Sequence, residues 1–336
     1  PSAPRSADTH RSAALAVLCR TSWLPPSQGR GPIGGRPVPA AAGTPEDYAV
    51  CFLRLPDPGS SAPSTSAGFP GGPLDLADLA LARANITDGS DPTPLALRIA
   101  AIRRTFEAAG MLLAGRPPPS FAREALRQVL RREGPAAFTA FLDDWGIGLR
   151  PNDVEELASF GFSQPTGEES AVFVAQVPDA EEVSYATAGG SEAAGLLWLR
   201  PSEALLLHRE GELELPLPQW YALRLLQERL PRLAGLNDFL ASEPCRGLRS
   251  LGPMEARPLG ATAAAAEAAG QVWLVLPGDE EHPASPGPRG QRHRVLAEAA
   301  TGGHGFRALA AEGGPEALAP RDPGRQAPAR AAVPRL

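Results

Sequence analysis

The chain has 336 residues, 43% of them hydrophobic, so it is long and apolar enough to bury a substantial core. Its formal net charge of -6 leaves no basic excess for counterion release, which argues against a dedicated nucleic-acid-binding protein and favours a small-molecule ligand. The three cysteines, Cys19, Cys51 and Cys245, are widely spaced and odd in number, which implies neither a disulfide framework nor a zinc cluster.

The first forty residues carry five arginines and one acidic residue around a short apolar run at 13–19. This composition is faintly like that of a targeting leader. The alternative, which we prefer, is that the run forms the first strand of the domain. No apolar run in the chain approaches the roughly 20 residues that a membrane-spanning helix requires.

β-favouring residues predict strands at 13–19 and 48–55, which could pair as a hairpin across a Pro- and Gly-rich loop. A glycine-rich turn, residues 68–72 with the sequence Gly-Phe-Pro-Gly-Gly, follows them. Glycines allow backbone shapes that other residues cannot take, so this turn could approach a phosphate closely. An ordinary turn is the alternative.

The clearest predicted helix begins at Thr93 and Pro94, a cap residue followed by proline, and runs to about residue 114. Apolar residues at helical spacing give it one buried stripe: Leu95, Ile99, Ile102, Phe106 and Leu113. Positions 104, 107 and 108 lie together on the opposite face, because residues three and four apart are neighbours on a helix.

Further elements predict a mixed α/β fold. We expect two helices at 120–132 and 135–145 as an insertion, strands at 170–177 and 195–199, and a short helix that begins at Pro201. A helical pair at 217–240 is broken at Pro231. Two late strands at 272–276 and 294–297 could form a hairpin, and periodicity disappears beyond Gly313.

The segment from Leu97 to Leu113 resembles the helix of the Nudix hydrolases, whose pattern is Arg-Glu-x-x-Glu-Glu-x-Gly followed by an apolar residue. Four residues match this pattern: Arg103, Glu107, Gly110 and Met111. The glycine-rich turn that ends at Gly72 is similar to the other end of the same motif. The long interval between this turn and Arg103 resembles that of the peroxisomal acyl-coenzyme A diphosphatase branch. Four other stretches resemble the same branch, at residues 69–75, 198–204, 215–221 and 276–280.

The resemblance covers roughly residues 11–310 and implies a Nudix-type α/β/α sandwich with a mixed central sheet. We expect a disordered N-terminus at 1–10 and a Nudix-like hydrolase domain at 11–245, with a helical insertion at about 115–150. A β-rich extension would follow at 246–312, and a disordered tail at 313–336.

The resemblance also implies a function. A family member of this kind would use Mg²⁺ or Mn²⁺ to cleave the diphosphate of coenzyme A or acyl-coenzyme A, giving 3',5'-ADP and (acyl-)4'-phosphopantetheine. Glu107 would then be the metal ligand and a catalytic residue together with Arg103, which would orient the glycine-rich turn. Gly71, Gly72 and Arg54 would bind the substrate and its phosphates.

The three acidic positions of the family pattern hold Arg104, Glu107 and Ala108 in this chain. A guanidinium about 4 Å from a divalent ion would be repelled by roughly 8 kcal/mol at an effective dielectric constant of about 20. The alternative function is therefore a Nudix-like module that binds nucleotide or acyl-coenzyme A without cleaving it. A third possibility is that other acids replace the missing ligands: Asp75, Asp78 or Glu192.

Two of the site residues have a structural alternative. Glu107 could be a solvated helix carboxylate, and the stem of Arg103 could cover apolar surface. The tripeptide Pro334-Arg335-Leu336 resembles the Ser-Lys-Leu class of peroxisomal address, which predicts a peroxisomal location and binding to an import receptor. The mitochondrion and the cytosol are the alternative locations.

Overall fold

The computed structural model describes most of the chain, and the account below is confined to that part. The described residues are 11–24, 46–54, 65–115, 118–161, 169–184, 186, 195–250, 254–255, 257–258, 271–282, 286–287, 289–299 and 306–313. The predicted disordered segments at 1–10 and 313–336 lie outside these ranges except for Gly313, and so does the tripeptide at 334–336.

The centre of the molecule is a mixed eight-stranded sheet. One edge of β1 (Arg11–Arg20) pairs in parallel with β6 (Glu169–Gln176). The other edge pairs antiparallel with β2 (Tyr48–Arg54) and with β4 (Gly71–Pro73). The pairing of β1 with β2 confirms the predicted hairpin.

The sheet has the strand order β3-β2-β1-β6-β5-β8, with β4 paired to β1 and β7 to β2. Only the β1–β6 and β5–β8 pairs are parallel among the described strands of this sheet. The remaining strands are β3 (Ala67–Gly68), β5 (Glu155–Gly161), β7 (Gly195–Leu199) and β8 (Met254–Glu255).

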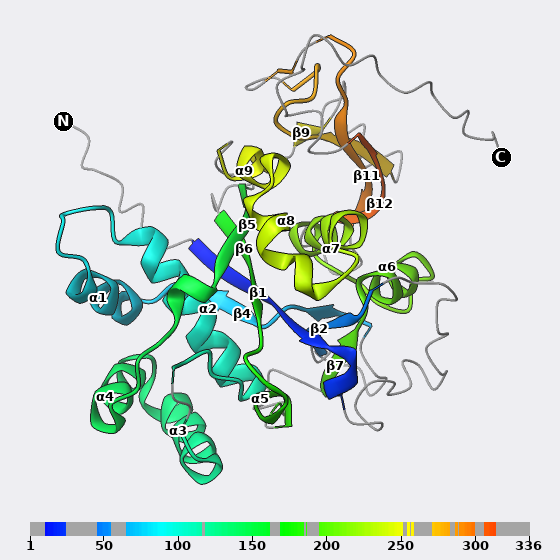
Figure 1. The fold of residues 1–336 in the computed structure, drawn as a ribbon. Coiled ribbons are helices and arrows are strands. Elements are labelled where there is room, and N and C mark those ends of the chain that lie inside the picture. Colours follow the sequence, from blue (N-terminus) through cyan, green and yellow to red (C-terminus); the bar gives the residue numbers. More distant parts are fainter. Residues whose placement is uncertain are drawn as a thin grey trace.

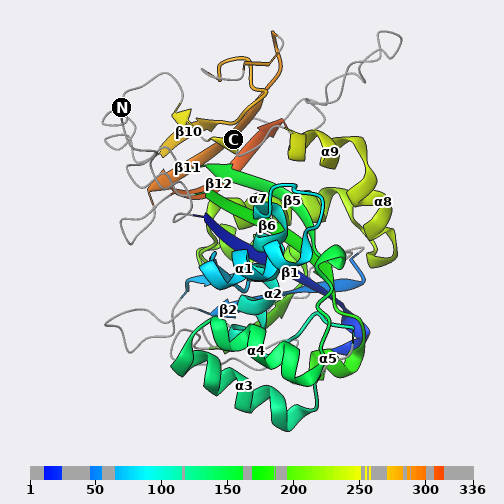
Figure 2. The ribbon, with the colours of Figure 1, turned by 90° about the vertical axis from the view of Figure 1, so that its left-hand side faces the viewer.

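Two helical layers cover the sheet, one on each face, and Figures 1 and 2 show them on opposite sides of β1. The first layer has α2 against the sheet and α1, α3, α4 and α5 around it; the second has α6, α7, α8 and α9. Their bounds are α1 (Leu76–Asn85), α2 (Thr93–Ala109), α3 (Ser120–Glu133), α4 (Ala136–Trp145), α5 (Ala180–Ser184), α6 (Pro201–Arg209), α7 (Leu217–Arg229), α8 (Leu236–Ala241) and α9 (Glu243–Ser250). Short 3-10 helices are present at Thr21–Trp23, Pro151–Asp153 and Leu233–Gly235.

β1 explains why both faces of the sheet need a cover. Its apolar residues are buried on both faces, as expected of an inner strand between two layers. Alternate residues belong to different clusters: Ala13, Leu15 and Val17 pack with the α2 layer, and Ala14, Ala16 and Leu18 pack with the α7 layer. The fold is therefore the mixed α/β arrangement that the sequence predicted.

A second, four-stranded sheet lies beyond α7, at the top of both views (Figures 1 and 2). Its strands are β9 (Arg257–Pro258), β10 (Gln271–Val275), β11 (His293–Ala299) and β12 (Phe306–Gly313), all antiparallel. The predicted late hairpin is present as β10 and β11. β12 extends the pairing through Gly313, where the sequence had predicted a disordered tail to begin.

No helix in the described ranges is long and apolar enough to cross a membrane. Cys19, Cys51 and Cys245 are free thiols, all buried. Burial raises the pKa of the Cys19 thiol to about 12, so this group stays protonated near neutral pH.

Candidate functional site

α2 presents the candidate site because its opposite face is anchored in the core. Ala100, Ile102 and Phe106 are fully buried in the cluster that includes β1. The helix ends at Ala109 rather than near residue 114, because Gly110 takes a left-handed conformation with φ of 76° and its N–H donates to the Phe106 carbonyl. The predicted end near residue 114 was wrong because the apolar residues after Gly110 continue the spacing of the buried stripe although they are not helical.

Arg103 is fully buried beneath the site. Its Nε and Nη2 donate to the two carboxylate oxygens of Asp78 at 2.8 and 2.7 Å, and its Nη1 donates to Oε1 of Glu107 at 2.8 Å. Burial alone would lower the pKa of Arg103, but the hydrogen bonds and charges of these two carboxylates raise it above its ordinary value. Arg103 is therefore a permanent cation that ties α2 to α1.

Glu107 is also bound by its other neighbour on the same helix face. Its Oε2 accepts a hydrogen bond from Nη1 of Arg104 at 3.0 Å, and its side chain is 19% exposed. Both carboxylate oxygens are thus engaged by guanidinium groups, Oε1 by Arg103 and Oε2 by Arg104. The predicted neighbours 104 and 107 do meet.

The two glycines at the end of the turn each have a close neighbour where a Cβ would be. A Cβ at Gly71 would lie 2.4 Å from the carbonyl oxygen of Ala13, because β4 pairs closely with β1 there. A Cβ at Gly72 would lie 2.9 Å from Nε of Arg104. Gly72 therefore gives the Arg104 side chain the space to lie across the turn.

The turn is held from the other side of the sheet by α7. The Phe69 N–H donates to Oε1 of Gln219 at 2.6 Å, and the Gln219 side chain also lies where a Cβ at Gly68 would be, 3.2 Å away. Sequence reasoning found the stretch at 215–221 only as a family resemblance and assigned Gln219 no role. The sequence feature that could have indicated a role for Gln219 is its position as a polar residue in the first turn of α7, among apolar neighbours.

The end of α2 is held by arginines of α3. Arg127 donates from Nε to the Glu107 carbonyl at 3.2 Å and from Nη2 to the Ala108 carbonyl at 3.1 Å. Arg123 forms a two-point pair with Glu182 of α5, at 2.7 Å for both contacts. These pairs fix the position of the carboxylate at 107 relative to the helical insertion.

The donors present do not fit Mg²⁺ or Mn²⁺. Such an ion takes about six oxygen ligands, with carboxylates central among them. Here Glu107 has both oxygens engaged by arginines, position 108 is a methyl group and position 104 is a cation. Across the described ranges, no three or more His, Cys, Asp or Glu side chains converge as a metal-binding group.

Four other predicted participants are already engaged, lie apart or fall outside the described residues. Asp75 and Asp78 form the capping box of α1, and Glu192 lies outside the described residues. Arg54 ends β2, where it pairs with Ala67 at the beginning of the turn, and it forms no hydrogen bond or ion pair with Arg103, Arg104 or Glu107. Their predicted roles in binding remain predictions.

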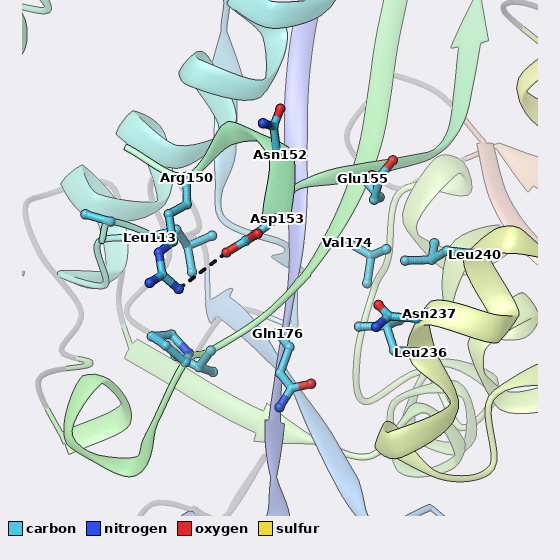
Figure 3. Close-up of a pocket in the computed structure, with 13 residues that line it drawn as sticks. Leu113, Arg150, Asn152, Asp153, Glu155, Val174, Gln176, Leu236, Asn237 and Leu240 are labelled. Atoms are coloured by element: carbon cyan, nitrogen blue, oxygen red, sulfur yellow. Dashed lines mark ion pairs between the residues drawn. The ribbon is translucent and has the colours of Figure 1, made fainter. Parts of the chain in front are cut away.

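A cavity of about 260 Å³ lies elsewhere, beside the C-terminal end of β6 (Figure 3). An apolar floor that includes Val174 and Leu240 meets a polar rim that includes Gln176 and the ion pair of Arg150 with Asp153, 3.5 Å between Nη1 and Oδ2. None of its lining residues belongs to the site on α2.

The chain matches no protein-family model. It is 28% identical to the acyl-coenzyme A diphosphatase NUDT19 of Gallus gallus over 318 aligned positions, which cover 77% of this chain and 79% of the relative. Among solved structures it is similar to a NUDIX hydrolase from Alicyclobacillus acidocaldarius at 21% identity, with a TM-score of 0.46 and coverage of 68% of this chain and 95% of that chain. The similarity to the Gallus gallus protein shows that this chain resembles the Nudix hydrolases over most of its length.

Proposed function

We propose that the chain is an acyl-coenzyme A diphosphatase-like protein that recognises coenzyme A and its acyl esters through their diphosphate. The Arg104 guanidinium, which lies across Gly72 beside Glu107, carries this proposal. A guanidinium beside a glycine turn suits an anionic, phosphate-bearing ligand. The similarity to the diphosphatase of Gallus gallus supports coenzyme A as the class of ligand.

Cleavage of that diphosphate to 3',5'-ADP and (acyl-)4'-phosphopantetheine is the second candidate. The same similarity supports it, as do the retained Arg103 and Glu107 of the Nudix-like helix. The substitutions at Arg104 and Ala108 favour binding over turnover, because the loss of a general base alone costs about 10²- to 10⁴-fold in rate.

Two measurements on the purified chain separate the candidates. Calorimetry measures the Kd for coenzyme A, and release of 3',5'-ADP in the presence of Mg²⁺ or Mn²⁺ measures cleavage. We expect the wild type to bind coenzyme A and to cleave it roughly 100-fold or more slowly than the double variant Arg104→Glu/Ala108→Glu, which restores the acidic face. Glu228→Gln, an exposed carboxylate of α7, is the control.

Each alternative has its own outcome. Rapid cleavage by the wild type that is abolished by Glu107→Gln and unaffected by Glu228→Gln would establish the hydrolase. The absence of both binding and cleavage would reject the coenzyme A proposal.

A peroxisomal location is part of the same proposal, supported by the tripeptide at 334–336 and by the sequence resemblance to the peroxisomal branch. A fluorescent protein fused to the N-terminal side of the chain should enter peroxisomes. Deletion of Pro334-Arg335-Leu336 should leave the fusion outside them. Unchanged import after the deletion would contradict a role for the tripeptide.

A further inference from the structure

The site on α2 contains two cations and two anions that compensate each other. Asp78 and Glu107 together receive four hydrogen bonds from Arg103 and Arg104. A divalent cation added to this cluster would have to displace a guanidinium from Glu107 and would then be repelled by it. A phosphate anion would be attracted by the same guanidinium without breaking that contact.

The two arginines differ in what they can offer a ligand. Arg103 is completely buried, and its three kinds of nitrogen all donate to carboxylates. The Arg104 side chain is 25% exposed, and its hydrogen bonding within the described ranges is limited to Glu107. Arg104 is therefore the cation of the pair that retains free donors.

The placement of Arg104 is built into the fold. Its stem lies against Gly72, where a Cβ would come within 2.9 Å of Nε and 3.1 Å of Cδ. The Nε atom is buried and has no hydrogen-bond partner in the structure. A buried donor without a partner is costly, so this nitrogen leaves the guanidinium of Arg104 incompletely satisfied.

We infer that the Arg104 guanidinium, rather than a divalent ion, is the cation that binds the diphosphate of the ligand, so that coenzyme A binds without Mg²⁺ or Mn²⁺. The inference rests on the proposed function and names the group of the protein that binds the ligand at that site. The planar guanidinium offers several N–H groups to phosphate oxygens in a fixed geometry, which suits a diphosphate. Glu107 then acts as a positioning residue that holds Arg104 over the turn.

Calorimetric titration with coenzyme A tests the inference, once with EDTA and once with Mg²⁺. The wild type should give the same Kd in both solutions. Arg104→Gln should raise the Kd by roughly 10- to 100-fold, as expected for the loss of a charged hydrogen-bond partner. Arg98→Gln, on the same helix and comparably exposed at 28%, is the matched control and should leave the Kd unchanged.

Two further probes are needed. One detects a folding defect, and the other shows which phosphate group of coenzyme A binds Arg104. Arg104→Lys keeps the charge and should retain more affinity than Arg104→Gln, while circular dichroism checks that each variant is folded. Dephospho-coenzyme A, which keeps the diphosphate but lacks the 3'-phosphate, should show the same dependence on Arg104. Pantetheine, which lacks the diphosphate, should not.

Binding that requires Mg²⁺, or equal losses from Arg98→Gln and Arg104→Gln, would overturn the inference and leave the proposed function standing. An Arg104 effect that disappears with dephospho-coenzyme A would assign Arg104 to the 3'-phosphate and would also overturn it. A failure to bind coenzyme A in either solution would reject the proposed function itself.

Discussion

The carboxylate of Glu107 meets one guanidinium on each of its oxygens. The contact with Arg104 follows from helix spacing and could be predicted from the sequence. The contact of Arg103 with Asp78 could not, because the two residues are 25 positions apart and α1, the helix that carries Asp78, was not predicted. The resemblance pointed to Arg103 and Glu107, which do meet in the structure, but the charge balance became visible only with Asp78 in place.

The two turn glycines should respond differently to a methyl group. Gly71→Ala places a Cβ against the backbone of Ala13, which cannot move without disturbing β1, so we expect a loss of about 1–3 kcal/mol in the free energy of unfolding. Gly72→Ala meets the flexible Arg104 side chain instead and should cost less stability. Urea unfolding measures both.

The same pair of variants reports on binding. If Arg104 contacts the ligand, its displacement by Gly72→Ala should weaken coenzyme A binding by roughly tenfold, a part of what a charged hydrogen bond contributes. A Gly72→Ala protein with unchanged affinity and a large loss of stability would show that the space beside Arg104 serves packing alone.

Whole elements with a regular pattern were predictable, and irregular ones were not. β7 was predicted with its observed bounds, and α2 from its first residue, because their apolar residues are regularly spaced. The predicted cap of α2 was wrong, since Pro92 rather than Thr93 is the N-cap and no side chain caps the helix. β5 was missed because an irregularity between Glu156 and Ala158 breaks the alternation that identifies a strand. α1 was missed although Asp75 and Asp78 carry a capping signal, because the stretch around it is rich in Pro and Gly.

The stability of the insertion helices should depend on the buried ion pair of Arg123 with Glu182. Arg123 is 4% exposed and Glu182 2%, and Glu182 also accepts the Leu112 N–H at 2.5 Å just beyond α2. Glu182→Ala leaves a buried guanidinium without its carboxylate, so we expect a loss of about 3–5 kcal/mol in the free energy of unfolding. Urea unfolding followed by circular dichroism gives the value.

An exposed pair provides the comparison. Arg224 and Glu228 are neighbours on α7 at 2.7 Å, but their side chains are 32% and 41% exposed. Glu228→Ala should cost less than about 1 kcal/mol. Similar losses for the two variants would mean that the buried pair does not hold α3 to α5.

At the scale of the whole molecule, the second sheet is joined to α7 through a buried histidine. Nδ1 of His293 lies 2.8 Å from the Pro277 carbonyl, which can only accept, so a neutral ring presents Nε2 as the acceptor for the Tyr221 hydroxyl at 2.7 Å. Burial lowers the pKa of His293 below its ordinary value. The neutral form is therefore the one that the folded protein favours.

This histidine makes stability depend on pH in a defined direction. The unfolded chain binds a proton on His293 at about pH 6.5 and the folded chain only at lower pH, so its contribution is complete above that value and is lost as the pH falls through the folded pKa. We expect Tm to fall as the pH is lowered from about 7 toward 5. His293→Gln should be less stable at neutral pH and should show a flatter dependence; an equally steep dependence in this variant would assign the effect to other groups.

The topology of the central sheet was beyond sequence reasoning, because strand patterns do not encode partners. β1 pairs in parallel with β6, and the Ser12 hydroxyl donates to the carbonyl of Glu169, which lies 157 positions later in the chain. On a ribosome that adds about 5–20 residues per second, the first described strand waits roughly 8–31 s for this neighbour. Until β6 has been made, this edge of β1 is open to pairing with other chains, so efficient production favours conditions in which nascent chains are kept apart.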